Sequence, residues 1–325
     1  MAILITGGAG YIGANAVRRL STAGEDVVVV DDFSTGHESR VGRAPTLRLD
    51  LSATGSVGPL TQFLVEHRVD GIIHFAAKKS VPESMERPLW YYRQNVDSLI
   101  AVLEAARDAG VQRLVFSSSA AVYGDVPAGR VDEDRHLDPA NPYGRTKLVG
   151  ELLTRDAARA GVVRVANLRY FNVAGAGADD LGDPQTNNLL TIVLDRLSRG
   201  EPVDVFGTDY DTPDGSCVRD FVHVDDLIDA HLAALDHLRT DDRGYDTFNV
   251  GTGSGASVLD VLRAVEDVTG RPLAVRQAPR RPGDPATVVA DVTRIRQTLG
   301  WSARLGLREI VESAWRAWPA RSKHD

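Results

Sequence analysis

The stretch that decides the fold reads ILITGGAGYIG and spans residues 3–13. Its first four residues are apolar or β-branched, which predicts a buried strand, and glycines follow at positions 7, 10 and 13. Between a strand and a helix, this spacing provides a tight turn, lets backbone amides approach a pyrophosphate, and lets the helix pack closely on the strand. We therefore expect a dinucleotide to bind at Gly7, Gly10, Tyr11, Ile12 and Gly13.

Two carboxylates extend this prediction. Asp31 ends the next apolar run and stands 31 − 13 = 18 residues beyond the last glycine, close to where an acidic side chain meets the adenosine ribose. Its charge would repel a 2′-phosphate, so we expect NAD rather than NADP. Asp50 and Leu51 follow a third strand, where an adenine would lie in a doubly wound sheet; a helix cap is the alternative use of Asp50.

Short apolar runs alternate with helical patterns along the first half of the chain. Strands are expected at 3–6, 27–30, 47–49, 71–75, 113–117 and 163–169, with helices at 12–23, 89–109 and 143–160. Such alternation predicts an α/β fold, here an NAD-binding Rossmann domain with a doubly wound parallel sheet over residues 1–172. A loop rich in Gly, Asp and Asn at 175–188 then leads to a smaller C-terminal α/β substrate domain, 173–325. Residues 219–250 either return to the first domain or stay with the second.

Composition excludes several classes of protein. The 325 residues include 37 Lys+Arg and 45 Asp+Glu, a formal charge of −8, which disfavours nucleic acid as a partner. A single cysteine, Cys217, excludes an internal disulfide framework and a thiolate zinc site, and we expect no metal. We expect neither a signal peptide nor a membrane partner, because the chain starts directly in a strand-like run and has no apolar run of bilayer length. The expected location is the cytoplasm.

The candidate catalytic residues come from two segments. Three serines, 117–119, end the strand at 113–117, and Pro142 starts a helix that places Tyr143 and Lys147 on one face. A free phenol has a pKa of about 10, but a nearby ammonium favours the phenolate. We expect Tyr143 to act as a base tuned by Lys147, while Ser119 hydrogen-bonds the reacting oxygen.

Together with the run SSSAAVYG at 117–124, these features resemble the extended short-chain dehydrogenase/reductase superfamily. Four further segments narrow the resemblance to its UDP-glucose 4-epimerases over residues 3 to about 315. They read HFAAKK at 74–79, LRYFNVAG at 168–175, DYDTPDG at 209–215 and VRDFVHVDDL at 218–227.

The resemblance implies a tightly held NAD, a UDP-hexose substrate and interconversion of UDP-glucose and UDP-galactose. Tyr143 would take the proton of the 4-hydroxyl while hydride passes from carbon 4 to NAD. The 4-keto sugar would then rotate and receive the hydride on its other face. The family is often dimeric through helices that correspond to 89–109 and 143–160, so we expect a homodimer.

The resemblance also assigns binding residues by position. Besides the glycine turn, the cofactor set is Asp31, Asp50, Leu51, Phe75, Ala76, Ala77, Lys79, Asn95, Ser117, Tyr143, Lys147 and Tyr170. The substrate set is Lys79, Ser119, Tyr143, Asn172, Asn188, Leu189, Val205, Phe206, Arg219, Val258, Arg281 and Asp284. The two arginines suit a diphosphate, which needs charged, forked donors. Asn172 and Asn188 could instead cap turns, and the apolar neighbours of His223 favour a structural role.

Three departures from the family pattern stand out. Ala14-Asn15 replaces a common Ser-His, and Phe221 replaces a frequent Tyr. Val288 stands where the family often has a large Tyr that bounds the sugar, so a UDP-N-acetylhexosamine is an alternative substrate, as is a UDP-uronic acid.

The same residues disfavour two other activities. A sugar 4,6-dehydratase would carry an Asp-Glu pair where this chain has Ala120-Ala121, so the acid and base for elimination are missing. A non-catalytic NAD-binding regulator would not need Ser119, Tyr143 and Lys147.

Overall fold

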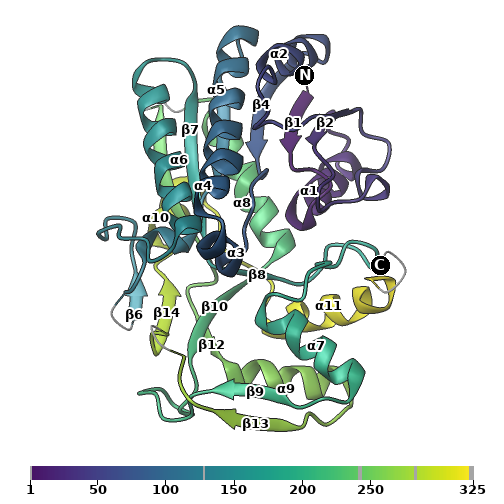
Figure 1. Cartoon of the computed structure of the whole chain (residues 1–325), viewed down its shortest axis with the longest axis vertical. Helices are drawn as coiled ribbons and strands as arrows, with labels where there is room; N and C mark the ends of the chain where they lie inside the picture. The colour runs from purple at the N-terminus through teal and green to yellow at the C-terminus, as the bar shows by residue number, and fades with distance from the viewer. Residues whose placement is uncertain (1, 127–128, 241–243, 282–283, 322–325) are drawn as a thin grey trace. The chain divides into compact units, whose positions relative to one another are not determined.

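Parallel strand pairing organises the N-terminal half of the chain in the computed structural model, which describes residues 2–126, 129–240, 244–281 and 284–321 (Figure 1). In these residues a seven-stranded sheet has the order β11-β7-β5-β4-β1-β2-β3, and the five pairings from β7 to β3 are parallel. The strands are β1 (Ala2–Thr6), β2 (Val27–Asp31), β3 (Thr46–Arg48), β4 (Val69–His74), β5 (Arg113–Ser117), β7 (Arg164–Tyr170) and β11 (Tyr245–Val250). The α/β Rossmann prediction is confirmed.

Helices connect and cover these strands. They are α1 (Tyr11–Thr22), α2 (Val57–Glu66), α3 (Val81–Glu86), α4 (Pro88–Tyr92), α5 (Ser98–Ala109), α6 (Pro142–Arg159) and α8 (Val224–His237), with 3₁₀ turns at Glu38–Val41 and Ala120–Tyr123. Apolar side chains of α2 and α5 pack with those of the strands in one core, for example Leu64, Leu99 and Leu114. Strand residues that face away from this core, such as Ile5, Val29 and Ile73, are also buried. The central strands are therefore covered on both faces, which explains their continuous apolar runs.

The chain divides into two compact units. The first consists of Met1–Gly124, His136–Tyr170 and Ile228–Phe248, and the second of Asp125–Arg135, Phe171–Leu227 and Asn249–Asp325. Most of α8 and β11 thus belongs to the first unit, although both lie late in the chain.

The second unit contains two small sheets. One has the order β12-β10-β14-β6 with β8 also on β10, and the other pairs β13 with β9. These strands are β6 (Gly129–Val131), β8 (Asn172–Ala174), β9 (Val203–Phe206), β10 (Val218–His223), β12 (Gly255–Ser257), β13 (Val275–Ala278) and β14 (Thr287–Ala290). Helices α7 (Leu189–Arg199), α9 (Val258–Thr269) and α11 (Leu307–Arg321) pack around a separate apolar core, and α10 (Thr293–Leu299) follows β14.

Candidate active site

The glycine turn between β1 and α1 is shaped by close backbone contacts. Gly7 has a φ of 69°, and a Cβ there would lie 2.8 Å from the backbone nitrogen of Ala76. A Cβ at Gly13 would lie 2.1 Å from the carbonyl oxygen of Gly7, so this glycine lets the helix pack on the turn. At Gly10, by contrast, the nearest atom is the Gly7 carbonyl oxygen at 3.3 Å. Packing alone therefore requires Gly7 and Gly13, whereas Gly10 leaves the backbone accessible to a ligand.

The start of α1 has the properties of an anion site. No side chain caps this helix at Gly10, and its first turn, which includes Tyr11 and Ile12, holds no acidic residue. Helix N-termini with these properties favour phosphate groups. The Lys79 ammonium lies 5.8 Å from the centre of the Tyr11 ring, which adds positive charge beside this turn.

Asp31 is held at the end of β2 by two backbone amides. Its Oδ2 accepts a hydrogen bond from the Ala9 nitrogen at 2.9 Å, and its Oδ1 accepts one from the Phe33 nitrogen at 2.7 Å. Burial raises the pKa of this carboxyl, although both amide hydrogen bonds oppose the rise. Each carboxylate oxygen retains a lone pair for a hydroxyl donor. The turn and Asp31 therefore fit the adenosine and pyrophosphate of a dinucleotide.

The other cofactor candidates near the adenosine end lie after β3. Asp50 accepts hydrogen bonds from the amide and hydroxyl of Ser52, and Leu51 is buried in the core. Ser52 in turn accepts a hydrogen bond from Gln94 at 2.6 Å. Asp50 thus organises a local turn, and both candidates lie next to the strand end.

The loop after β4 carries Phe75, Ala76, Ala77 and Lys79 and is anchored by Asn95. The Asn95 Oδ1 accepts a hydrogen bond from the Lys78 nitrogen, and its Nδ2 donates to the Lys78 carbonyl and to Thr146 Oγ1. Asn95 lies in a π-helical turn, Arg93–Asp97, a feature often found at functional sites. Its side chain fixes the β4 loop on α6.

The proposed catalytic side chains converge at the end of β5. Ser119 caps the short 3₁₀ turn by accepting a hydrogen bond from the Ala121 nitrogen at 3.1 Å. Asn141 caps α6 by accepting one from the Gly144 nitrogen at 2.9 Å, with Pro142 in the first turn, as the sequence predicts. These caps set the starting points of the two elements that carry Ser119 and Tyr143.

Tyr143 and Lys147 are both buried on α6. Burial raises the pKa of the Tyr143 phenol, and a hydrogen bond with Ser119 opposes the rise. The Lys147 Nζ donates to the carbonyl of Ser117 at 2.7 Å and lies 5.0 Å from the centre of the Phe116 ring. Burial lowers the pKa of Lys147 to about 7, although the charge of Glu151 opposes this. Burial therefore moves the pKa of both side chains away from its ordinary value in water.

A second hydrogen-bonded chain lies beside them. The Ser117 hydroxyl is 2.7 Å from His231 Nε2, and it also hydrogen-bonds Tyr170. Burial, with the charge of Tyr143, raises the pKa of Tyr170. The His231 ring packs 4.7 Å from that of Phe75. His231 comes from α8, and its place here could not be inferred from local sequence.

A buried ion pair supports the strand-end serines. Glu151 accepts hydrogen bonds from Arg169 Nε at 2.9 Å and Nη2 at 2.6 Å, and also from the Ser118 hydroxyl. Both charged side chains are buried, and Arg169 Nη1 also donates to the Tyr123 hydroxyl. The sequence prediction missed this pair. The repeated spacing of four from Tyr143 through Lys147 to Glu151 was the one available signal, since it places all three on one helical face.

The second unit brings together several substrate candidates. Arg219 Nη2 lies 3.5 Å from Asp284 Oδ1, and the Arg281 guanidinium lies 3.8 Å from the centre of the Phe206 ring. In the pairing of β10 with β14, Arg219 stands opposite Val288. The cluster thus combines two cations, one aromatic face and a small apolar side chain.

The remaining candidates have mainly structural contacts. Asn188 caps α7 through the Thr191 nitrogen at 3.0 Å, and Asn172 donates to the carbonyl of Asp220 at 3.1 Å. Leu189 begins α7, Val258 begins α9, and Val205 is buried in β9. Both nitrogens of His223 are engaged, by Ser313 and by the Asp225 amide, which agrees with a structural role.

Within the described part of the chain, no group of three or more His, Cys, Asp or Glu could hold a metal ion. The helices of that same part include none with both the length and the apolar character needed to span a membrane.

Comparison with known proteins places this arrangement in a family. Residues 3–251 match the NAD dependent epimerase/dehydratase family. The chain belongs to the NAD-dependent epimerase/dehydratase family. This agrees with the superfamily resemblance carried by the glycine turn and by the Tyr143/Lys147 pair.

Relatives within the NAD-dependent epimerase/dehydratase family align along nearly the whole chain. A UDP-glucose 4-epimerase from Azospirillum brasilense is 45% identical over 318 residues, which cover 96% of this chain and 90% of that protein. The crystal structure of UDP-glucose-4-epimerase from Stenotrophomonas maltophila, with bound NAD and formylated UDP-arabinopyranose, has 41% identity and a TM-score of 0.94, and covers 100% of both chains. The UDP-Glc/GlcNAc 4-epimerase from Campylobacter jejuni has 37% identity and a TM-score of 0.86, and covers 99% of both.

Proposed function

We propose that this protein is an NAD-dependent 4-epimerase that interconverts UDP-glucose and UDP-galactose. The observation that carries the proposal is the grouping of Ser119, Tyr143 and Lys147 around the end of β5, in a chain that aligns end to end with UDP-glucose 4-epimerases. The glycine turn and Asp31 supply a site that fits NAD.

Each side chain has a defined task in this reaction. Tyr143 accepts the proton of the sugar's 4-hydroxyl and returns it after the sugar has turned over. Because the hydride also returns to carbon 4, there is no net oxidation. Ser119 hydrogen-bonds the same oxygen, and the Lys147 ammonium stabilises the phenolate of a tyrosine whose burial raises its pKa. The glycine turn and Asp31 would hold NAD, which would supply the hydride acceptor and donor for carbon 4.

We assign NAD to residues of the first unit and the UDP group of the substrate to residues of the second. Arg219 and Arg281 supply guanidinium forks for a diphosphate, and Phe206 supplies a ring on which a uracil can stack. These contacts would hold the uracil and the diphosphate. The hexose ring makes none of them, so it would be free to rotate.

Replacing Tyr143 with Phe tests the catalytic assignment. The variant should lose at least about 100-fold in the rate of conversion of UDP-galactose, because general acid–base groups contribute roughly 10²–10⁴-fold. NAD content, measured after acid release, should stay at the wild-type level. Wild-type turnover in the Phe variant would exclude Tyr143 as the base.

A UDP-N-acetylhexosamine is a second candidate substrate. The small side chain of Val288, paired with Arg219 in the β10–β14 register, favours a bulkier sugar, and the Campylobacter jejuni relative is described as a UDP-Glc/GlcNAc 4-epimerase. Converting Val288 to Tyr should lower the ratio of UDP-GlcNAc to UDP-glucose activity. An unchanged ratio would remove this candidate.

We also propose a homodimer formed through α4, α5 and α6. Three large apolar side chains are exposed on these helices: Leu89 at 80%, Ile100 at 38% and Leu152 at 40%. Exposed apolar side chains that form a contiguous patch mark protein–protein interfaces, and we expect these three to form part of one. Light scattering should give twice the mass of the chain for the wild type and the monomer mass for a Leu89→Glu/Leu152→Glu variant.

A cytoplasmic location completes the proposal. The chain's one cysteine, Cys217, is buried and free, which suits a reducing compartment. Cell fractionation with an antibody tests this, and recovery outside the cytoplasm would refute it.

A further inference from the structure

Lys78 links two loops of the first unit that are far apart in the sequence. Its ammonium donates a hydrogen bond to the Ser34 hydroxyl at 2.5 Å and lies 3.5 Å from Asp32 Oδ2. The Lys78 side chain is 16% exposed and that of Asp32 is 31% exposed, so the pair is partly shielded from water. An ion pair in this setting is stronger than one at a fully solvated surface.

The sheet order shows what this link crosses. Lys78 follows β4 and Asp32 follows β2, and in the sheet β1 lies between these two strands. All three strands are parallel, so the loops leave the same edge, with the glycine turn of β1 between them. Two strand spacings amount to about 10 Å, a gap that a lysine side chain and an aspartate can close together. The link therefore passes across the end of β1, where the turn presents its amides to a pyrophosphate.

Both ends of the link are held in place. The Asn95 carboxamide fixes the amide and the carbonyl of Lys78, and the Trp90 ring centre lies 5.8 Å from its ammonium. Asp32 Oδ1 accepts hydrogen bonds from the amide and the hydroxyl of Ser34. Although partial burial opposes it, these bonds and the Lys78 charge hold the pKa of Asp32 below its usual value, so the carboxylate is charged at neutral pH. The adjacent Lys79 instead lies near Tyr11, so the two lysines have different tasks.

We propose that Lys78 and Asp32 form a strap across the dinucleotide site that retains NAD between catalytic cycles. This inference rests on the proposed function, because a self-regenerating epimerase gains from a cofactor that does not leave. The strap is a retention device, and neither residue takes part in the chemistry. Opening it requires breaking the Lys78–Asp32 pair and the Lys78–Ser34 hydrogen bond, which slows the release of NAD.

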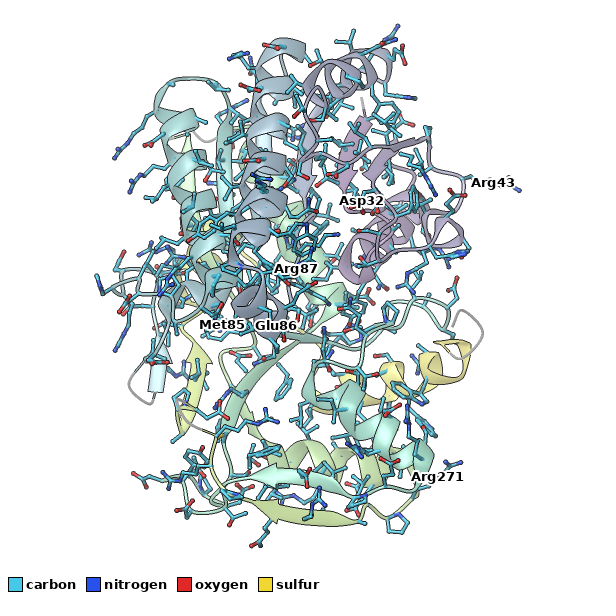
Figure 2. The ribbon with its side chains drawn as sticks, viewed as in Figure 1. Asp32, Arg43, Met85, Glu86, Arg87 and Arg271 are labelled. Atoms are coloured by element: carbon cyan, nitrogen blue, oxygen red, sulfur yellow. The ribbon has the colours of Figure 1, made fainter. Side chains whose placement is uncertain are left out.

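The test is a double-mutant cycle on NAD release. Wild type, Lys78→Met, Asp32→Asn and the double variant are loaded with NAD and mixed with excess deuterated NAD, and retained unlabelled NAD is counted by mass spectrometry over time. Arg43→Met is the matched control, since it removes a cation from the same β2–β3 connection. Arg43 is exposed and points away from the ribbon, whereas Asp32 lies close to it (Figure 2). Thermal melting of each variant checks that the fold is intact.

Each single variant should release NAD about tenfold faster, because each removes the Lys78–Asp32 ion pair. The effect in the double variant should be smaller than the product of the two single effects, because both substitutions act on that shared pair. Arg43→Met should stay within about twofold of the wild type, and Lys78→Arg should restore slow release.

The strap would be refuted if Asp32→Asn slowed release while Lys78→Met accelerated it, since that pattern reports only the net charge beside an anionic ligand. Wild-type release rates in both single variants would also refute it. A wild-type protein that neither retains nor takes up NAD would instead overturn the proposed function, and the strap with it.

Discussion

Loss of either partner of the buried Glu151–Arg169 pair should strongly destabilise the first unit. Replacing Glu151 with Gln keeps the shape of the side chain but removes the charge that faces the guanidinium. Arg169 is 6% exposed, so water cannot replace the lost anion. Removing one partner of a buried ion pair costs roughly 3–5 kcal/mol, because the other charge stays buried without compensation.

The loss of stability should depend on whether the other charged partner is still present. The Arg169→Met variant should be destabilised to a similar extent, because it leaves the Glu151 carboxylate, which is 3% exposed, without its guanidinium partner. The Glu151→Gln/Arg169→Met double variant should lose less than the sum of the singles, by about 1–3 kcal/mol, because the carboxylate and the guanidinium are then removed together.

Urea denaturation of the four proteins measures this cycle, with Glu312→Gln as the control. Glu312 pairs with Arg308 across one turn of α11, and both are exposed, at 37% and 72%. An exposed helical pair of this kind contributes about 0.3–0.5 kcal/mol. A loss of stability in Glu151→Gln no larger than that in Glu312→Gln would contradict a buried ion pair between Glu151 and Arg169, as would additive losses in the two single variants.

Three further substitutions follow from the same structure. Gly13→Ala places a Cβ 2.1 Å from the Gly7 carbonyl oxygen, so it should cost about 1–3 kcal/mol of stability and abolish NAD retention; a variant purified with wild-type NAD content would contradict this. Burial lowers the pKa of Lys147 from 10.5 to about 7 in the folded protein, so the unfolded chain binds the Lys147 proton more tightly. The free energy of unfolding of the wild type should therefore rise between pH 7 and pH 10. Lys147→Met should lack that rise in urea denaturation, whereas Arg145→Met, an exposed change on the same helix, should keep it; identical pH curves for wild type and Lys147→Met would refute the assignment. Asp31→Asn leaves only one acceptor for the Ala9 and Phe33 amides, so NAD affinity measured by calorimetry should fall about tenfold, and an unchanged affinity would argue against a ribose contact.

Local signals made much of the fold predictable. The strand at 113–117 was predicted with the bounds the structure has, because an apolar run ends there in serines. The start of α6 followed from Pro142, and the cap by Asn141 confirms it. These features depend on residues that are close in the sequence, which is where propensity and capping act.

Long-range contacts explain what could not be predicted. The helical stretch expected at 89–109 is present, as α4 and α5 joined without a break by a π-helical turn that the sequence did not predict. The turn occurs where the Asn95 side chain hydrogen-bonds the backbone of Lys78, a contact set by the tertiary fold. In the same way, His231 reaches Ser117 from 114 residues away, and no local pattern could indicate that pairing.

The most direct test of the account uses the purified protein, UDP-galactose and no added NAD. The anomeric proton signals are followed by NMR until they stop changing. Conversion to a mixture of UDP-galactose and UDP-glucose is the predicted result, since retained NAD would be regenerated in every turnover. Signals that stay constant, both without and with added NAD, would contradict UDP-glucose 4-epimerase activity.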